Sequence, residues 1–322
     1  MSSKKLVTVF GSTGNQGGSI ISLWSKSPEL QAKYSIRGIT RDTSKPAAQR
    51  LKSLGVEVVS ADLNNADSLS HAIEGAYAVF GVTNYWEFTD KAKEFNQGKS
   101  MADAAFAAGV KHIVWSSLPH TTELTNGKLS QIDHFDAKAD VERYIEEHKS
   151  KTGTLASYYM PAFFMSNFSG MGMINPGPDG TLTFAVPFSP SAIIPMIDIN
   201  KDTGAWVWGA IEAGSAADGV QIQAAGDWIT GQEIVDIFTK YGGAGEVKFW
   251  EAPRDTYKSW LVPKMGDYIA EEFTQNMDLI GEFSYYGKGT ESKQQAADKL
   301  LYNGQHKTSF KEYVEQNKPF KF

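Results

Sequence analysis

The sequence predicts an α/β fold built on a doubly wound parallel sheet, and three observations predict it. Short apolar, β-branched segments alternate with helix-length amphipathic segments over the first half of the chain. A glycine-rich turn separates the first predicted strand from the first predicted helix. The chain has 322 residues, which is enough for one large domain or two closely joined domains.

The alternation of strands and helices can be followed element by element. Strands are predicted at residues 6–10, 34–40, 56–59, 77–82, 111–115 and 155–160. Helices are predicted between them at residues 16–26, 47–54, 66–73, 91–108 and 135–148. Gly55, Gly75 and Gly109 follow three of these helices, where the left-handed C-terminal residue is usually glycine. This order is that of a Rossmann-type fold with helices on both faces of the sheet.

The pattern changes after Pro161, where glycine, proline, asparagine and phenylalanine accumulate. Later segments predict helices at 202–212 and 230–241, a strand at 219–224, and short strands mixed with amphipathic helices from 247 onward. Thr230 and Glu233 have the spacing of a capping box. We therefore expect residues 1–160 to form an NAD(P)-binding Rossmann domain whose sheet later segments complete. Residues 161–322 are expected to form a smaller α+β C-terminal lobe that binds substrate or partner.

Composition narrows the classes of function. The net charge is −6 and no basic run is present, so direct binding to nucleic acid has little electrostatic support. The chain has no cysteine and its six histidines are scattered, so we expect no metal site. Neither a secretory leader nor an apolar segment long enough to span a membrane is apparent. These features predict a cytoplasmic protein, with the nucleus as a second compartment. The sequence is compatible with a monomer or a homodimer.

The glycine-rich turn carries the spacing GxxGxxG between strand and helix. The first glycine permits the tight turn, the second lets a pyrophosphate approach the backbone, and the third lets the helix pack on the sheet. The helix N-terminus then presents unpaired N–H groups to phosphate. The predicted contacts are Gly11, Thr13, Gly14, Asn15, Gln16 and Gly17.

The end of the second strand predicts the choice of cofactor. Arg41 stands where an NAD site usually holds an acidic residue, and it can bind a 2′-phosphate with help from Lys45. Asp42 is adjacent and is compatible with NAD, but the pair of cations favours NADP(H). Asp62, after the third strand, is a candidate for contact with the adenine ring. Thr83 and Asn84, after the fourth strand, are candidates near the nicotinamide ribose.

Several motifs, taken in order, resemble the NmrA-like family of atypical short-chain dehydrogenases. They are the turn Gly11-Ser12-Thr13-Gly14-Asn15-Gln16-Gly17-Gly18, then Thr40-Arg41-Asp42, Ala61-Asp62-Leu63, Ser116-Ser117-Leu118, His134-Phe135-Asp136-Ala137-Lys138, the segment from Pro161 to Phe168, and Ile197-Asp198-Ile199-Asn200. The resemblance covers nearly the whole chain and is most specific in the first two hundred residues. It implies an NADP(H)-binding fold, in a family that holds both redox sensors acting as transcriptional co-regulators and related reductases.

The resemblance also implies a catalytic set. Typical short-chain dehydrogenases use a serine, a tyrosine and a lysine, with tyrosine four residues before lysine. Lys138 matches the lysine and Ser116 or Ser117 the serine, but His134 stands where tyrosine is expected. His134 can donate a proton at neutral pH, and Lys138 can do this work as in isoflavone-reductase-like relatives. A site that binds cofactor without chemistry is the third possibility.

Aromatic and polar side chains near the expected nicotinamide predict a substrate pocket. The candidates are Trp86, His120, Phe163, Phe164 and Asn167. They suit a planar or hydrophobic substrate, and they equally suit a plugged site. The sequence therefore supports two functions. One is an NADPH-dependent reductase of a carbonyl, enone, imine or quinone. The other is a non-catalytic NADP(H) sensor that binds a regulatory protein.

Overall fold

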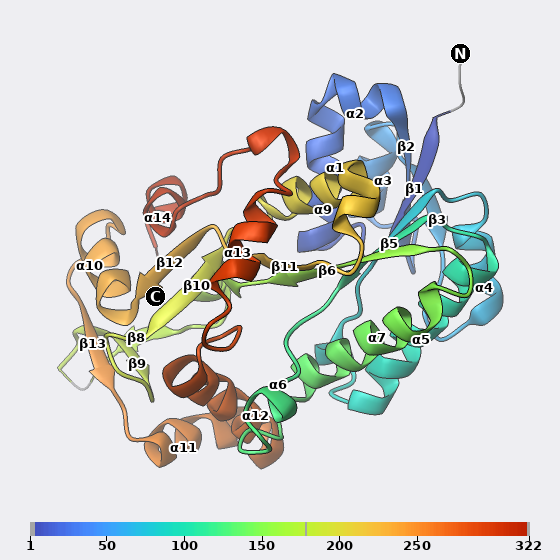
Figure 1. The fold of residues 1–322 in the computed structure, drawn as a ribbon. Helices are drawn as coiled ribbons and strands as arrows, with labels where there is room; N and C mark the ends of the chain where they lie inside the picture. The colour runs from blue at the N-terminus through green and yellow to red at the C-terminus, as the bar shows by residue number, and fades with distance from the viewer. Residues whose placement is uncertain (1–3, 178, 321–322) are drawn as a thin grey trace.

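Seven parallel strands form the main sheet of the protein, for which a computed structural model describes residues 4–177 and 179–320. The strand order is β11-β6-β5-β4-β1-β2-β3 (Figure 1). The strands are β1 (Lys5–Val9), β2 (Tyr34–Thr40), β3 (Glu57–Ser60), β4 (Ala78–Gly81), β5 (His112–Ser116), β6 (Leu155–Pro161) and β11 (Gln221–Ala224). The order reverses between β1 and β4, which confirms the predicted doubly wound, Rossmann-type sheet. Ligands of such sheets bind outside the carboxyl ends of the strands at this reversal.

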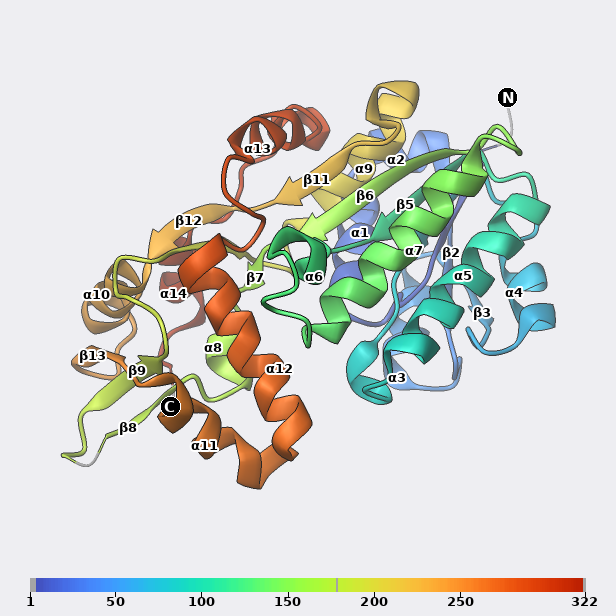
Figure 2. The ribbon, with the colours of Figure 1, turned by 60° about the horizontal axis from the view of Figure 1, so that its bottom comes forward.

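Helices cover both faces of the main sheet (Figures 1 and 2). One face carries α1 (Asn15–Lys26), α3 (Pro46–Ser53) and α9 (Thr203–Ala213), and the other carries α4 (Ala66–Ile73), α5 (Lys91–Ala107) and α7 (Asp133–Lys149). Each face has its own buried apolar cluster, with Trp206 and Trp208 in one and Trp115 in the other. One short helix, α2 (Pro28–Lys33), was not predicted. It begins where the Ser27 hydroxyl accepts the N–H of Leu30 at 3.2 Å.

Two small residues bring α5 and α7 unusually close to each other and to the sheet. A Cβ atom at Gly98 would lie 2.6 Å from Val141 Cγ2 and 2.9 Å from the Trp115 ring. A Cβ atom at Gly81 would lie 2.4 Å from Met101 Cε. Because α5 and α7 pack this tightly, polar groups on their facing sides are excluded from water.

The rest of the chain adds two sheets of three strands, in the orders β12-β10-β7 and β13-β9-β8. Their strands are β7 (Phe163–Phe164), β8 (Ile174–Pro176), β9 (Leu182–Val186), β10 (Ile193–Ile197), β12 (Asp227–Thr230) and β13 (Val247–Glu251). The remaining helices are α6 (Thr121–Leu124), α8 (Asn167–Gly170), α10 (Gly231–Tyr241), α11 (Arg254–Met265), α12 (Asp267–Asp278), α13 (Glu291–Asp298) and α14 (Phe310–Asn317). Single turns of other helix types occur at Tyr85–Glu87, Gly214–Ala217, Leu279–Phe283 and Tyr302–Gly304.

Two local predictions for this half can be compared with the structure. The capping box of Thr230 and Glu233 is confirmed at the start of α10. Short strands mixed with helices beyond residue 247 were expected, but in the described residues β13 is the only strand there, and helices α11 to α14 follow it. Good helix formers such as the glutamates and glutamine of α12 favour this outcome. Within the described ranges, no helix combines the length and apolarity required for a membrane span.

Candidate functional site

The glycine-rich turn follows β1 and lies against the segment that follows β4. Gly11 has a φ of +60°, and a Cβ atom there would lie 2.8 Å from Val82 Cγ1. Gly14 donates its N–H to Gly11 O at 2.9 Å, which closes the turn. A Cβ atom at Gly17 would lie only 2.4 Å from Gly11 O. The turn is therefore as tight as the glycine spacing predicts.

The N-terminus of α1 is open to an anion. The N-cap residue Gly14 supplies no side chain to cap the helix, and no acidic residue occupies its first turn. Thr13 and Asn15 are exposed beside it, and Gln16 Oε1 is buried without a hydrogen-bond partner. Because the first N–H groups of a helix lack partners within it, this end fits the pyrophosphate of a dinucleotide.

Ser12 is a part of the turn that the sequence analysis did not single out. Its hydroxyl is buried and donates to Ile39 O at 2.8 Å, which fastens the turn to the end of β2. The same strand end carries Arg41, whose exposed guanidinium pairs with Glu87. Lys45 stands exposed at the N-cap of α3. The two cations predicted to bind a 2′-phosphate therefore lie on the same loop.

Asp62 follows β3 in an exposed turn. Its carboxylate accepts the N–H of Asn64 at 2.8 Å, and this bond from the backbone holds the pKa of Asp62 below its usual value. A cavity of about 360 Å³ lies beside this turn. It is lined by Leu63, Asn64, Asp90, Ala92, Lys93, Asn96, Gln97 and Ser100. Asp62 is thus placed at the carboxyl edge of the sheet, where it was expected to meet adenine.

Lys138 is held at the end of β4 by three acceptors. Its Nζ lies 2.7 Å from Glu94 Oε1, 2.9 Å from Thr83 Oγ1 and 3.2 Å from Thr83 O. The Thr83 hydroxyl also donates to Glu94 Oε1 at 2.6 Å. All three side chains are buried. The structure therefore brings together the predicted residues Lys138 and Thr83 and adds Glu94 as their shared partner.

His134 stands one turn before Lys138 on α7 and pairs with a residue from the far end of the chain. Its Nδ1 lies 2.6 Å from Glu272 Oε1 on α12, and its backbone N–H donates to the same oxygen at 3.1 Å. Tyr85 donates its hydroxyl to Glu272 Oε2 at 2.9 Å. Burial, with the nearby Glu272 carboxylate, raises the pKa of Tyr85 well above its usual range, so Tyr85 stays protonated.

Aromatic rings surround the His134 imidazole. The Trp86 ring centre lies 4.8 Å from it, the Phe135 centre 4.8 Å and the Tyr85 centre 5.8 Å. The ring centre of Phe273 on α12 lies 5.1 Å from the ring centre of Trp86. Asn84, exposed, is the N-cap of the turn that carries Tyr85 and Trp86. Trp86, a predicted pocket residue, is therefore beside His134, and it remains exposed.

The two serines after β5 occupy different surroundings. Ser116 Oγ is buried and has no hydrogen-bond partner. Ser117 Oγ donates to Glu142 Oε2 at 2.5 Å, one turn beyond Lys138 on α7. Burial raises the pKa of Glu142. Because successive side chains of a strand point to opposite faces, only Ser117 lies on the α7 side of the sheet.

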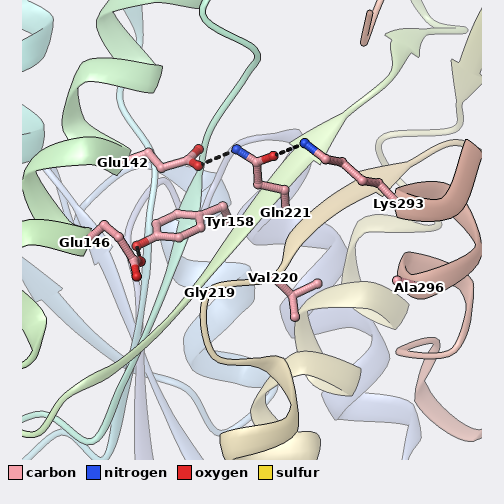
Figure 3. A pocket seen from close by; sticks show the side chains of 8 residues that line it. All are labelled: Glu142, Glu146, Tyr158, Gly219, Val220, Gln221, Lys293 and Ala296. Atoms are coloured by element: carbon pink, nitrogen blue, oxygen red, sulfur yellow. Dashed lines mark hydrogen bonds between the residues drawn. The ribbon is translucent and has the colours of Figure 1, made fainter. Parts of the chain in front are cut away.

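A cavity of about 460 Å³ opens beyond Glu142 (Figure 3). It is lined by Glu142, Glu146, Tyr158, Gly219, Val220, Gln221, Lys293 and Ala296. Gln221 donates to Glu142 Oε1 at 2.6 Å and accepts from Lys293 Nζ at 2.8 Å (Figure 3). This cavity lies between α7, β11 and α13, at the edge of the sheet and apart from the turn after β1.

The other predicted pocket residues are placed elsewhere. His120 contacts Asp136 and Asp140, which lie on the opposite side of α7 from His134 and Lys138. Phe163 and Phe164 form β7, half-buried beside β10. Asn167 begins the short helix α8. Among the described residues, none of the hydrogen bonds, ion pairs or ring contacts joins these four to Lys138 or His134.

Two functional candidates were missed by reading the sequence, Glu94 and Glu272. The signal for Glu94 was present, because it occupies the buried stripe of α5 with Gln97, Gly98 and Met101. A charged residue on such a stripe needs a buried partner. For Glu272 no comparable signal exists, since several polar residues of α12 are buried and its partner is 138 residues away.

Comparisons with known proteins agree with this architecture. The model of the NmrA-like family matches residues 3–314. The NmrA-like family domain-containing oxidoreductase ptmS of Penicillium ochrochloron is 32% identical over 256 residues, which is 74% of each chain. The crystal structure of NmrA, a negative transcriptional regulator, in complex with NADP superposes with a TM-score of 0.78 at 20% identity, covering 98% of this chain and 95% of that one. Triphenylmethane reductase of a Citrobacter species, complexed with NADP(H), gives 0.73 at 21% identity over 96% of this chain and 99% of that one.

The two solved structures share the fold, and the match to the family model extends over almost the entire sequence. The chain therefore belongs to the NmrA-like family.

Proposed function

We propose that this protein is an NADPH-dependent reductase of a small molecule with a polarised double bond, such as a carbonyl, enone, imine or quinone. The observation that carries the proposal is Lys138 Nζ, held 2.9 Å from Thr83 Oγ1 at the end of β4 with His134 one turn away. Relatives described as oxidoreductases and a structural neighbour described as a reductase support it. In this proposal residues 1–160 bind the dinucleotide and residues 161–322 contribute to the substrate side.

The residues around the first turn fit NADP(H) binding. The open N-terminus of α1 and the close approach at Gly17 suit the pyrophosphate. Arg41 and Lys45 would hold the 2′-phosphate, with Glu87 released from Arg41. When bound, NADPH supplies a hydride to the electrophilic carbon of the substrate. NADP-complexed structural neighbours support this choice of cofactor.

Lys138 is proposed to hold the nicotinamide ribose together with Thr83. Three protein acceptors already surround its ammonium, so it can bind a ribose hydroxyl only by exchanging or sharing one of them. The Thr83 hydroxyl is the natural exchange partner, since it can turn from Glu94 to the ribose. Glu94 keeps the buried ammonium paired throughout.

His134 is proposed to supply the proton that balances the hydride. It replaces the tyrosine of typical short-chain dehydrogenases at the same helical spacing from Lys138. A tyrosine does lie nearby, but Tyr85 already donates its hydroxyl to Glu272 and its pKa is raised, so it is a poor acid. Ser116 or Ser117 is proposed to bind a substrate heteroatom. Ser117 lies on the α7 side, but its hydroxyl must first leave Glu142, whereas the Ser116 hydroxyl has no hydrogen-bond partner.

The direct test is to follow NADPH absorbance with a panel of quinones, enones, ketones and cyclic imines. We expect turnover with wild type and a loss of kcat in Lys138→Ala. Lys149→Ala is a matched control, because Lys149 is on the same helix, is also 11% exposed and also forms an ion pair. Equal losses in both variants would point to damage to α7 instead of a role for Lys138.

A second function is favoured by one observation: every donor of the Lys138 ammonium and the Nδ1 of His134 already has a protein partner. Such a site suits an NADP(H) sensor that binds a regulatory protein without catalysis. A structural neighbour described as a negative transcriptional regulator supports this second function. The sensor predicts tight, saturable NADPH binding, no turnover, and partner affinity that changes with cofactor. Partner binding that ignores cofactor would exclude it.

A further inference from the structure

We propose that Glu272 of α12 is a positioning residue for His134. It holds the imidazole with the Nδ1–H bond directed at its carboxylate, so that Nε2 is the nitrogen that exchanges a proton with substrate. The destination of that proton rests on the proposed function. The orientation of the ring and its tautomer are properties of the protein alone and can be tested separately.

Glu272 is fixed from three sides in the interior. Its side chain has no exposed surface. Oε1 accepts from the His134 backbone N–H at 3.1 Å and lies 2.6 Å from His134 Nδ1, while Oε2 accepts from the Tyr85 hydroxyl at 2.9 Å. The carboxylate is therefore satisfied by three donors and has little freedom to move.

The carboxylate of Glu272, which accepts from the start of α7, decides the direction of the hydrogen bonds at His134. His134 is the second residue of α7, so its N–H has no acceptor within the helix. The N-cap residue Ile132 supplies no side-chain cap, and Glu272 fills that role from another element. A carboxylate at a helix N-terminus is favoured by the helix dipole. Since a carboxylate can only accept, the Nδ1 of His134 must carry a hydrogen.

This arrangement gives a balanced proton transfer. In the charged imidazolium, Nδ1–H is donated to Glu272 and Nε2–H is left for the substrate. When the Nε2–H bond breaks and an O–H or N–H bond forms on the reduced substrate, His134 becomes neutral in the Nδ1–H tautomer. The opposite tautomer would place the Nδ1 lone pair against the carboxylate. Glu272 thus selects the tautomer that can take up the next proton at Nε2.

The position of α12 makes this contact a link between the two parts of the chain. Figure 2 shows α12 beside the N-terminal end of α7. Gln275 on α12 accepts the backbone N–H of Gln131 at 2.9 Å, and Tyr268 donates to Asp133 at 2.5 Å. The C-terminal lobe therefore closes over the start of α7 and supplies the group that orients the proposed acid.

The first experiment reads the tautomer directly. Ring-nitrogen NMR of the full chain, with His134 assigned through the His134→Gln spectrum, should show a hydrogen bonded to Nδ1 in wild type. In Glu272→Gln the tautomer should persist, because the His134 backbone N–H requires the amide oxygen on its side and Tyr85 can accept from the amide NH₂. In Glu272→Ala it should be lost. A wild-type Nε2–H tautomer would overturn the inference.

The second experiment asks whether Glu272 acts through His134. With NADPH and a substrate from the panel, kcat should fall by up to about 10²-fold in Glu272→Ala and less in Glu272→Gln. The double variant His134→Gln/Glu272→Ala should be no slower than His134→Gln alone. A further drop in the double variant would contradict a positioning role. An Nδ1–H tautomer in a protein that turns over nothing would refute the reductase and still support the positioning of His134.

A matched control separates positioning from general damage to the lobe contact. Gln275→Ala removes two hydrogen bonds between α12 and Gln131, before α7, and one to Glu271, without touching His134. It should lower thermal stability by an amount similar to Glu272→Ala while leaving the tautomer and kcat near wild type. A tautomer change in Gln275→Ala would show that the packing of α12, and not the Glu272 carboxylate, determines the tautomer of the His134 ring.

Discussion

Glu94 on α5 accepts a hydrogen bond from the Lys138 ammonium on α7 at 2.7 Å, and the two side chains are 2% and 11% exposed. Glu94 Oε2 is buried without a partner, so the carboxylate is held by one oxygen. Removing one member of a buried ion pair leaves the other charge uncompensated. Glu94 therefore fixes the position of the proposed ribose-binding lysine, and loss of either member of the pair should destabilise the folded protein.

Glu94→Gln should destabilise the folded protein by about 3 kcal/mol, because it leaves the Lys138 ammonium buried without a counter-charge. Urea unfolding followed by tryptophan fluorescence measures the change. Glu282→Gln, which removes a half-exposed partner of Lys128, should cost less than about 1 kcal/mol. Equal effects of the two substitutions would mean that the buried pair contributes no more than a surface one.

Gly17→Ala should weaken NADPH binding at least about tenfold, which corresponds to about 1.4 kcal/mol. The added Cβ would lie 2.4 Å from Gly11 O, so α1 must move away from the turn that binds pyrophosphate. Fluorescence titration with NADPH measures the affinity.

Gly18→Ala is the control, because nothing lies within 4 Å of its Cβ position in the same helix. It should keep the affinity and raise stability by about 0.5–1 kcal/mol through helix propensity. Loss of NADPH binding in Gly18→Ala as well would show that the start of α1 tolerates no added side chain, even where there is free volume for it.

Arg41→Ala should reduce affinity for NADPH about 10- to 100-fold and leave affinity for NADH close to wild type. The reason is that a charge-assisted hydrogen bond to the 2′-phosphate contributes about 1.5–3 kcal/mol. Parallel titrations with the two cofactors give the ratio. Arg50→Ala, on the exposed side of α3, should alter neither. A parallel loss for both cofactors would argue against recognition of the 2′-phosphate by Arg41.

His112 should make the protein lose stability as pH falls. Burial lowers the pKa of His112 from 6.5 to about 4, so the unfolded chain binds more protons between these values. The contribution of His112 is complete above pH 6.5 and decreases by about 3 kcal/mol as pH falls to 4. Denaturant unfolding across this range should show a shallower decrease for His112→Gln than for wild type.

Asp202 acts in the opposite direction in the same range, because burial raises its pKa to about 6. It is present in both proteins, so the difference between their pH profiles isolates His112. Identical slopes for wild type and His112→Gln would mean that His112 titrates alike in the folded and unfolded chains.

The order of the main sheet could be predicted because its signals are local. The apolar strands, the glycines that end helices and the turn at Gly11 each depend on a few neighbouring residues. Gly55, Gly75 and Gly109 all have positive φ, as helix ends predict. The sequence did not predict α2, because six residues are too few to show the periodic pattern of apolar residues that indicates a helix.

The candidate site was predictable only in part. The spacing of His134 and Lys138 follows from helix geometry, and the turn after β1 follows from its glycines. His120, Phe163, Phe164 and Asn167 were expected near them because they follow strands of the sheet. In the structure His120 contacts α7, Phe163 and Phe164 form β7 of the second sheet, and Asn167 begins α8, because the direction of a loop after its strand is set by distant packing.

By itself, therefore, the sequence determined a doubly wound sheet with a glycine-rich turn and a helix that presents His134 and Lys138. Only the tertiary structure decided that Glu94 pairs with Lys138 and that the Glu272 carboxylate contacts the His134 imidazole. Both partners reach the site across a helix interface, and such contacts depend on how whole faces pack. The close approach of α5 and α7 at Gly98 permits the contact between Glu94 and Lys138. The docking of α12 on α7 creates the contact between Glu272 and His134. No local pattern of residues specifies the distance in either contact.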